Sequence, residues 1–179
     1  SKSADPYWTE GAKAIFACTG YRLAEECKEM GAQPTLTSLL YLLTQSTIEE
    51  LHNFLKGTEA ARHINPAADK QSASMLSTLS QSITPLGFLK DSTPDKPGFS
   101  IRRWMADDTL KGTLFLTSSG DQHSTIQPLL TMWMSLCNTA LMSQPRSNDR
   151  LCWFLIDELP SLNRLPDLED GLAQARQFG

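Results

Sequence analysis

Two adjacent carboxylates, Asp157 and Glu158, follow the continuous apolar run Leu151–Ile156. An apolar run without alternation is typical of a central strand in a parallel sheet, because both faces of such a strand are covered. Ligands of α/β proteins bind at the carboxyl ends of these strands. The pair therefore suits a Walker B element, in which Asp157 holds Mg²⁺ through its hydration shell and Glu158 orients and deprotonates the attacking water. The alternative is a strand that simply ends in two solvated acids.

The elements around this pair must bring it to the rim of a sheet. Leu114–Thr117 reads as a short apolar strand, and Ser124, with Gln127, caps a long apolar helix that extends at least to Leu141. We expect Pro128 in the first turn of that helix, where amides have no intrahelical partner. Together with Leu151–Ile156 the pattern predicts a βαβ unit, which crosses over right-handed. Two strands make a poor sheet, so we expect the other strands to come from chain outside this sequence.

The first half of the chain carries helix signals and almost no strand signals. Residues 1–89 are predicted to form an all-α domain, residues 90–98 a linker rich in Pro, Asp and Lys, and residues 99–179 a partial α/β domain. The fold class is therefore mainly α. Capping residues predict where the helices begin and end. The signals are a helix start at Asp5-Pro6, an N-cap at Thr35, a capping box at Thr47 with Glu50, a helix start at Asn65-Pro66, and C-terminal glycines at Gly31 and Gly57.

Composition and charge exclude several classes of protein. Sixteen Lys and Arg against twenty Asp and Glu give a net charge of −4, so no global positive field attracts a polyphosphate. No apolar run approaches the ~20 residues that cross a bilayer, and no signal-peptide pattern opens the chain. We expect a soluble piece of a larger protein, because the sequence opens with Ser and stops at a Gly after a predicted helix.

Other candidate sites are weaker. The four cysteines, Cys18, Cys27, Cys137 and Cys152, have no CxxC spacing and are interpreted as reduced core residues, although a disulfide stays open. The three histidines, His52, His63 and His123, have no metal-ligand spacing, which makes a zinc site improbable. His123 stands in a loop after a predicted strand, where it could touch nucleotide or DNA, but an exposed histidine at a helix start is the commoner explanation.

The residues after Asp157 and Glu158, read as Leu159-Pro160-Ser161 onward to Gly179, resemble the Walker B region of the conjugative coupling proteins of bacterial type IV secretion, of the TraD and TraG kind. The resemblance continues upstream at Phe99–Met105, Leu114–Ser118 and Gln127–Leu130, and at Asp5–Trp8, where the helical insertion of this family begins. It implies a RecA-like ATPase with an all-α domain inserted between Walker A and Walker B. It also implies a homo-hexamer, anchored in the inner membrane and facing the cytoplasm. That hexamer would receive relaxase, accessory DNA-binding proteins and DNA and deliver them to the secretion channel.

Carried over to this sequence, the resemblance gives Asp157 as the Mg²⁺-linked carboxylate and Glu158 as the catalytic base. Arg176 matches the arginine thought to reach the neighbouring subunit's nucleotide, although without the resemblance it reads as a solvated residue near a helix C-terminus. ATP and Mg²⁺ are thus expected cofactors of the full-length protein. The sequence contains no G-x-x-x-x-G-K-[ST] loop, so we expect this chain alone to bind no nucleotide firmly and to lack ATPase activity.

The role of the helical half follows from its charge. Residues 1–98 carry nine basic and eleven acidic side chains, with Glu25, Glu26 and Glu29 among the basic residues of the first helix. Such a surface does not favour tracking of DNA phosphates. We therefore expect this half to recognise relaxosome proteins. The alternatives are a domain that only shapes the motor, and a non-enzymatic helical adaptor whose α/β segment is scaffold.

Overall fold

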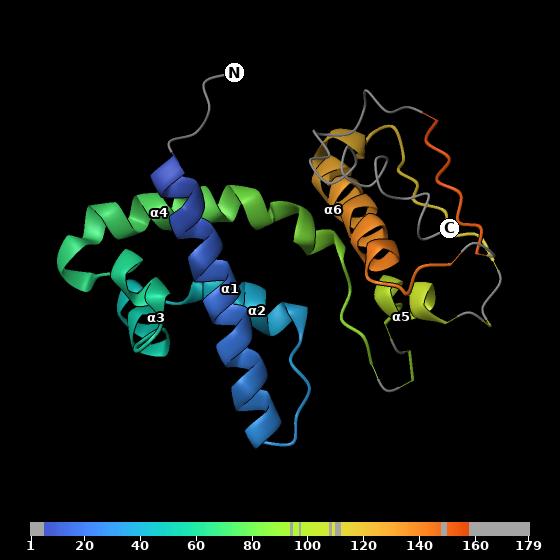
Figure 1. The fold of residues 1–179 in the computed structure, drawn as a ribbon. Coiled ribbons are helices and arrows are strands. Elements are labelled where there is room, and N and C mark those ends of the chain that lie inside the picture. Colours follow the sequence, from blue (N-terminus) through green and yellow to red (C-terminus); the bar gives the residue numbers. More distant parts are fainter. Residues whose placement is uncertain are drawn as a thin grey trace. The chain divides into compact units, whose positions relative to one another are not determined.

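The chain divides into two units, Ser1–Lys96 and Pro97–Gly179, each described here by itself. A computed structural model describes residues 6–93, 95–96, 98–107, 109, 112–147 and 150–157. Helices dominate both units (Figure 1), which confirms the expectation of a mainly α chain. None of the helices in the described ranges combines the length and apolar character needed to cross a bilayer.

The first unit is a compact group of helices. Its elements are α1 (Pro6–Glu29), α2 (Leu36–Gln45), α3 (Ile48–Phe54), η1 (Glu59–His63), η2 (Pro66–Ala68), α4 (Asp69–Ile83) and η3 (Thr84–Phe88). The long helices α1 and α4 cross each other, and α2 and α3 pack beside them (Figure 1). The fully buried side chains of this core include Ile15, Leu51, Leu55, Ile64, Met75 and Leu79. Each contributes about 1.5–3 kcal/mol relative to an exposed side chain.

The crossing of α1 and α4 depends on Gly11. A Cβ atom at this position would lie 2.5 Å from Cε and 2.7 Å from Sδ of Met75, which is fully buried. Glycine therefore lets the two helices approach each other more closely than any other residue would. A second glycine of α1, Gly20, has no such constraint, because its Cβ would meet only Leu39 at 4.0 Å.

The predicted helix ends that fall within the described residues of this unit are confirmed, whereas Asp5 lies outside them. Thr35 accepts a hydrogen bond from the amide of Ser38, and Thr47 and Glu50 form a complete capping box. Gly31 and Gly57 have φ values of 66° and 88°, the left-handed conformation expected of glycine after a helix. Asn65 accepts from the amide of Ala67, although the first turn there is the 3₁₀ helix η2 rather than the start of α4.

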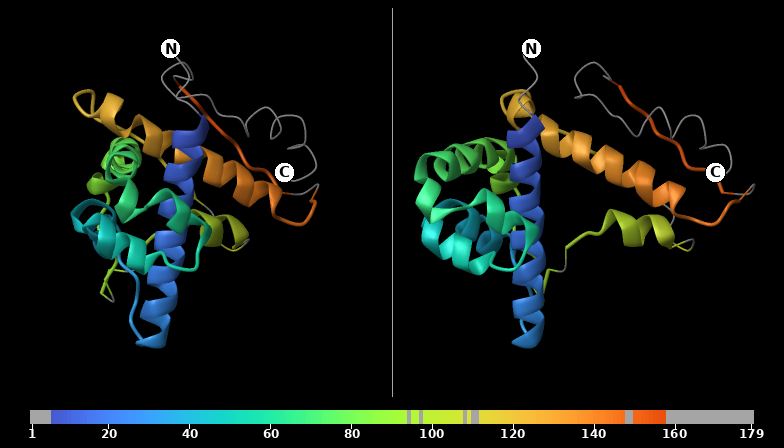
Figure 2. Two further views of the ribbon diagram at one scale, coloured as in Figure 1. Left: turned by 90° about the vertical axis from the view of Figure 1, so that its left-hand side faces the viewer. Right: turned by 60° about the vertical axis from the view of Figure 1, so that its left-hand side comes forward.

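The second unit contains α5 (Ile101–Ala106) and α6 (His123–Met142), which pack against each other. The sequence analysis did not predict α5, whose N-cap is Ser100 with its hydroxyl accepting from the amide of Arg103. Two extended segments, 112–119 and 150–157, accompany these helices. In both views of Figure 2, segment 150–157 (red) runs back along α6 (orange) toward the N-terminal end of that helix.

The prediction of two buried strands is wrong for the described residues. Neither 114–117 nor 151–156 is assigned as a strand, and Leu151, Trp153 and Leu155 are 77%, 80% and 89% exposed. The intervening Cys152, Phe154 and Ile156 are half-buried, so only one face of the segment is covered. The physical reason is that a central strand needs backbone partners on both sides, and the described part of the chain supplies none for these two segments.

The predicted start of the long helix also needs correction. α6 begins at His123 and its N-cap is Gln122, which makes no side-chain cap hydrogen bond, so Ser124 is not the cap. Pro128 consequently lies inside the helix rather than in its first turn. Proline there leaves the Ser124 carbonyl without an i+4 amide donor.

Candidate functional site

Asp157 is the one sequence-predicted site residue that the structure describes. It ends the extended segment 150–157 and is exposed, and no hydrogen bond or ion pair joins it to another described residue. Its carboxylate is thus free to meet a hard cation or its water shell. Glu158 and Arg176 lie outside the described residues.

Cys152 lies on the half-buried face of the segment that leads to Asp157. Burial raises the pKa of the thiols of both Cys137, on α6, and Cys152, and the charge of Cys152 raises the pKa of Cys137 further. All four cysteines of the chain are free thiols, as expected. Arg150 fixes the turn before the segment, since its guanidinium Nη1 donates to the carbonyl of Pro145 at 3.1 Å.

A second polar group stands at the start of α6. The Nδ1 atom of His123 lies 2.6 Å from Oγ of Ser118, the residue that follows the extended stretch 114–117. The other ring nitrogen, Nε2, is buried and has no hydrogen-bond partner among the described residues. The sequence analysis noted His123 as a loop residue but missed its bond to Ser118. The available signal was a hydroxyl at the end of a predicted strand, five positions before a histidine.

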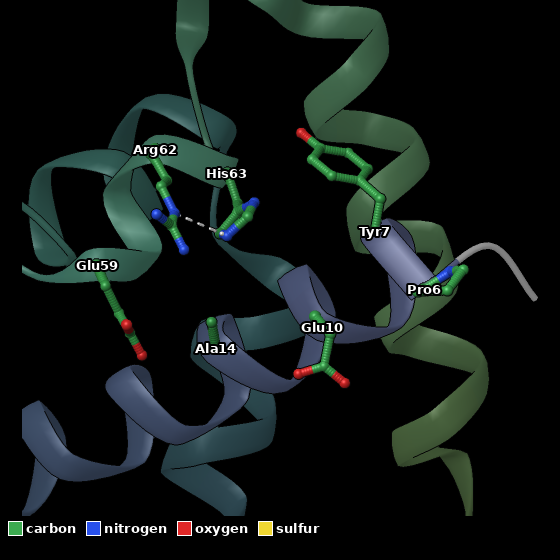
Figure 3. A pocket seen from close by; sticks show the side chains of 7 residues that line it. All are labelled: Pro6, Tyr7, Glu10, Ala14, Glu59, Arg62 and His63. Atoms are coloured by element: carbon green, nitrogen blue, oxygen red, sulfur yellow. Dashed lines mark hydrogen bonds between the residues drawn. The ribbon is translucent and has the colours of Figure 1, made fainter.

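The first unit contains a pocket of about 590 Å³ beside the N-terminal turn of α1, which the sequence analysis did not predict. Figure 3 shows the residues that line it, Pro6, Tyr7, Glu10, Ala14, Glu59, Arg62 and His63. Its charges are largely internally matched, since Glu10 pairs with Lys13 at 2.8 Å and Glu59 is accompanied by Arg62. The pocket therefore offers neither a phosphate nor a metal cation a strong net field.

His63 is the most perturbed group of this pocket. Arg62 Nε donates to its Nε2 at 3.2 Å (Figure 3), so the proton of the neutral ring sits on Nδ1. Nδ1 has no partner among the described residues and faces Gly11, where a Cβ would lie 3.1 Å away. Burial lowers the pKa of His63, and the positive charge of Arg62 lowers it further. The neutral ring is thus a packing element between η1 and α1.

Metal ligands do not cluster in the described part of the chain, where no group of three or more His, Cys, Asp or Glu could hold an ion. Any divalent cation near Asp157 would therefore be held together with a ligand such as nucleotide phosphate and with water, which is the usual coordination of Mg²⁺.

Comparison with known proteins gives a consistent picture over the whole chain. The family model of the type IV secretion-system coupling protein DNA-binding domain matches residues 1–179. Coupling protein TraD of Escherichia coli (strain K12) is 30% identical over 178 residues, which cover 98% of this chain and 24% of TraD.

Two solved structures of plasmid coupling protein TrwB are also similar. One, in complex with a non-hydrolysable ATP analogue, ADPNP, has a TM-score of 0.77 and 29% identity over 96% of this chain and 40% of that chain. The other, in complex with ADP and Mg²⁺, has a TM-score of 0.69 and 26% identity over 98% of this chain and 45% of that chain. The chain thus spans about a quarter of TraD and less than half of the TrwB structures.

Proposed function

Because this chain belongs to the type IV secretion-system coupling protein family, through its DNA-binding domain, we propose that it forms part of an ATPase that moves DNA and protein into a secretion channel during conjugation. The observation that carries the proposal is the combination of the match over the entire chain with the similarity to TrwB structures that contain nucleotide. The parent protein works as a homo-hexamer on the cytoplasmic side of the bacterial inner membrane.

Within that protein, residues 1–89 form the all-α insertion, 90–98 the linker and 99–179 part of a RecA-like domain. The exposed face of segment 150–157 supports this organisation, because Leu151, Trp153 and Leu155 are apolar side chains at 77% to 89% exposure. Phe115 in the other extended segment is 79% exposed. In the parent sheet these faces, and the backbone that has no partner strand among the described residues, are covered by further strands.

The nucleotide site lies at the end of segment 150–157. Asp157 binds the hydration shell of Mg²⁺, an assignment supported by its exposed carboxylate, which pairs with no other described residue. The metal, when bound, neutralises charge on the phosphate oxygens. Glu158 orients the attacking water and accepts its proton. Arg176 reaches the nucleotide of a neighbouring subunit, a role worth roughly 10³–10⁵ in rate in well-studied phosphoryl transfer.

The experiment is a comparison of full-length wild-type protein with Glu158→Gln. The amide keeps the shape of the side chain but cannot accept a proton, so hydrolysis should be abolished while nucleotide binding persists. Glu169→Gln, which changes the same type of side chain elsewhere in the sequence, should hydrolyse ATP at the wild-type rate. Normal turnover by Glu158→Gln would reject the base assignment, whereas absence of ATP hydrolysis by the wild-type protein would favour a non-enzymatic helical adaptor.

The helical unit selects the relaxosome substrate, the relaxase and its accessory DNA-binding proteins. Its charge supports protein recognition over DNA tracking, since acidic side chains outnumber basic ones in residues 1–98. It also exposes apolar side chains suited to protein contacts, with Tyr21, Met30 and Tyr41 at 67%, 71% and 62% exposure.

A salt titration tests this role with the 179-residue chain. Relaxosome proteins, single-stranded DNA and double-stranded DNA are titrated at increasing ionic strength. Phosphate contacts weaken steeply with salt, so binding to relaxosome protein should persist after binding to either DNA has been lost. DNA binding that outlasts protein binding would contradict the assignment.

A further inference from the structure

We propose that His123, held in place by Ser118, donates a hydrogen bond from Nε2 to a phosphate oxygen of the bound nucleotide. The inference rests on the proposed function, because it uses the nucleotide site that Asp157 borders. It adds a contact residue from the N-terminal end of the crossover helix, outside the acidic motif and outside the residues carried over from the family.

The first support is the fixed orientation of the His123 ring. Nδ1 lies 2.6 Å from Ser118 Oγ, and turning the ring by half a revolution would replace this nitrogen with carbon and lose the bond. When the Ser118 hydroxyl donates to Nδ1, the proton of the neutral ring is on Nε2. When the ring is protonated, Nε2 again carries a proton. The proposed contact uses these two states, because in the other neutral tautomer Nδ1 donates to Ser118 Oγ and Nε2 is an acceptor.

The second support is that this donor is buried and unsatisfied. Nε2 has no partner among the described residues, and buried polar atoms without a partner are uncommon in folded proteins. Among the described residues, Nδ1 of His63 is also buried without a partner, and it faces Gly11 of α1.

The third support is the direction of the two segments in this unit. The extended segment 112–119 is followed by α6, which begins at His123. Segment 150–157 runs back along α6 toward the N-terminal end of that helix (Figure 2) and ends at Asp157.

The chemistry of Asp157 and His123 together fits binding of a nucleotide better than a purely structural role. A carboxylate that attracts Mg²⁺ and an imidazole donor at the same end of a helix address the two charges of a metal–phosphate group, the cation and the anionic oxygens. The same topological argument applies to α/β folds in general, where ligands bind outside the carboxyl ends of neighbouring strands.

The test uses the full-length protein with Mg²⁺ and ADP. Histidine C2 hydrogen–deuterium exchange is read by mass spectrometry, with His52 and His63 as internal references. A phosphate oxygen beside Nε2 should change the exchange rate of His123 on addition of Mg²⁺ and ADP, without changing the rates of the references. An unchanged exchange rate at His123 would overturn the proposal, because the nucleotide would then make no contact with the ring.

Affinity gives an independent readout. A hydrogen bond to a charged oxygen corresponds to roughly a 10- to 100-fold change in binding, so His123→Ala should weaken ADP binding by that factor. His123→Gln, which retains an amide donor, should recover part of the loss, and Gln122→Ala serves as the neighbouring control. Unchanged affinity in His123→Ala would contradict the contact. If this variant does not fold, the exchange measurement on wild-type protein still decides.

ATP hydrolysis by Glu158→Gln and the Mg²⁺ dependence of ADP binding by Asp157→Asn are measured in the same experiments. If both variants lose these properties but His123→Ala binds ADP normally, the nucleotide site stands and only the histidine contact is rejected. If neither alters hydrolysis or the Mg²⁺ dependence of binding, the nucleotide site itself is misplaced.

Discussion

Ser118 Oγ and His123 Nδ1 lie 2.6 Å apart, so the end of one extended segment is tied directly to the first residue of α6. Neither residue belongs to a pattern that the sequence marks as chemical, yet the bond fixes where the crossover helix begins. The end of segment 150–157 returns to the same end of α6 (Figure 2). The polar edge of the second unit is therefore organised by this bond as much as by the acidic motif.

The Ser118–His123 bond should contribute measurably to the stability of the 179-residue chain. Ser118→Ala removes the partner of Nδ1 and leaves both ring nitrogens unsatisfied, at a cost of about 1–3 kcal/mol. Ser118→Thr retains the hydroxyl and should remain close to wild type. Chemical denaturation of the three proteins measures the difference, and equal stabilities for alanine and threonine would show that the bond is energetically silent.

Gly11 should be intolerant of a methyl group where Gly20 is not. Both glycines lie in α1, so alanine gains about 1 kcal/mol of helix propensity at either position. At Gly11 the new Cβ must displace Met75, which is buried, and overpacking costs about 1–3 kcal/mol. Thermal unfolding should therefore place Gly20→Ala above and Gly11→Ala below wild type. A Gly11→Ala variant as stable as Gly20→Ala would contradict this expectation and would show that the end of the Met75 side chain moves aside.

The helical unit should lose stability as the medium becomes mildly acidic. Burial, followed by the charge of Arg62, lowers the pKa of His63 below its unfolded value of about 6.5. The unfolded chain then binds more protons than the folded chain below that pH, so stability is full above it and falls as the pH decreases. The melting temperature measured between pH 8 and 5 should fall less in His63→Gln than in wild type, and Arg62→Gln should lie between them. If the melting temperatures of wild type and His63→Gln depend on pH in the same way, His63 is not the cause of the acid destabilisation.

Local signals predicted the helical unit well because its caps and glycines act within a few residues. The capping box of Thr47 and Glu50 and the left-handed Gly31 and Gly57 are examples. The strands could not be assessed in the same way. The run Leu151–Ile156 has the composition of a buried strand, but burial depends on partner strands, which the described part of the chain does not supply. The hydrogen bond between Ser118 and His123 could not be predicted, because hydrogen-bonded hydroxyl and imidazole side chains have no characteristic spacing in a sequence.

The exposed face of segment 150–157 gives a test of the missing sheet. Leu155 is 89% exposed, so Leu155→Asn should change the stability of the 179-residue chain by no more than about 0.5 kcal/mol. In the full-length protein, where we propose that this face is covered, the same substitution should cost about 1.5–3 kcal/mol. Leu141→Ala, at a position only 1% exposed, should be destabilising in both proteins. Equal effects of Leu155→Asn in the two contexts would argue against a sheet that covers this face.

The most direct measurement of the central claim is the Mg²⁺ dependence of ADP affinity in the full-length protein, with and without Asp157→Asn. Asparagine keeps the size of the side chain but loses the charge that attracts the hydrated cation. Substitution of groups outside the first coordination layer of a metal typically costs 10- to 100-fold in metal affinity. We predict that wild-type protein binds ADP more tightly with Mg²⁺ than with EDTA, and that Asp157→Asn removes most of this difference. An undiminished Mg²⁺ effect in Asp157→Asn would contradict the assignment of a magnesium nucleotide to the end of segment 150–157.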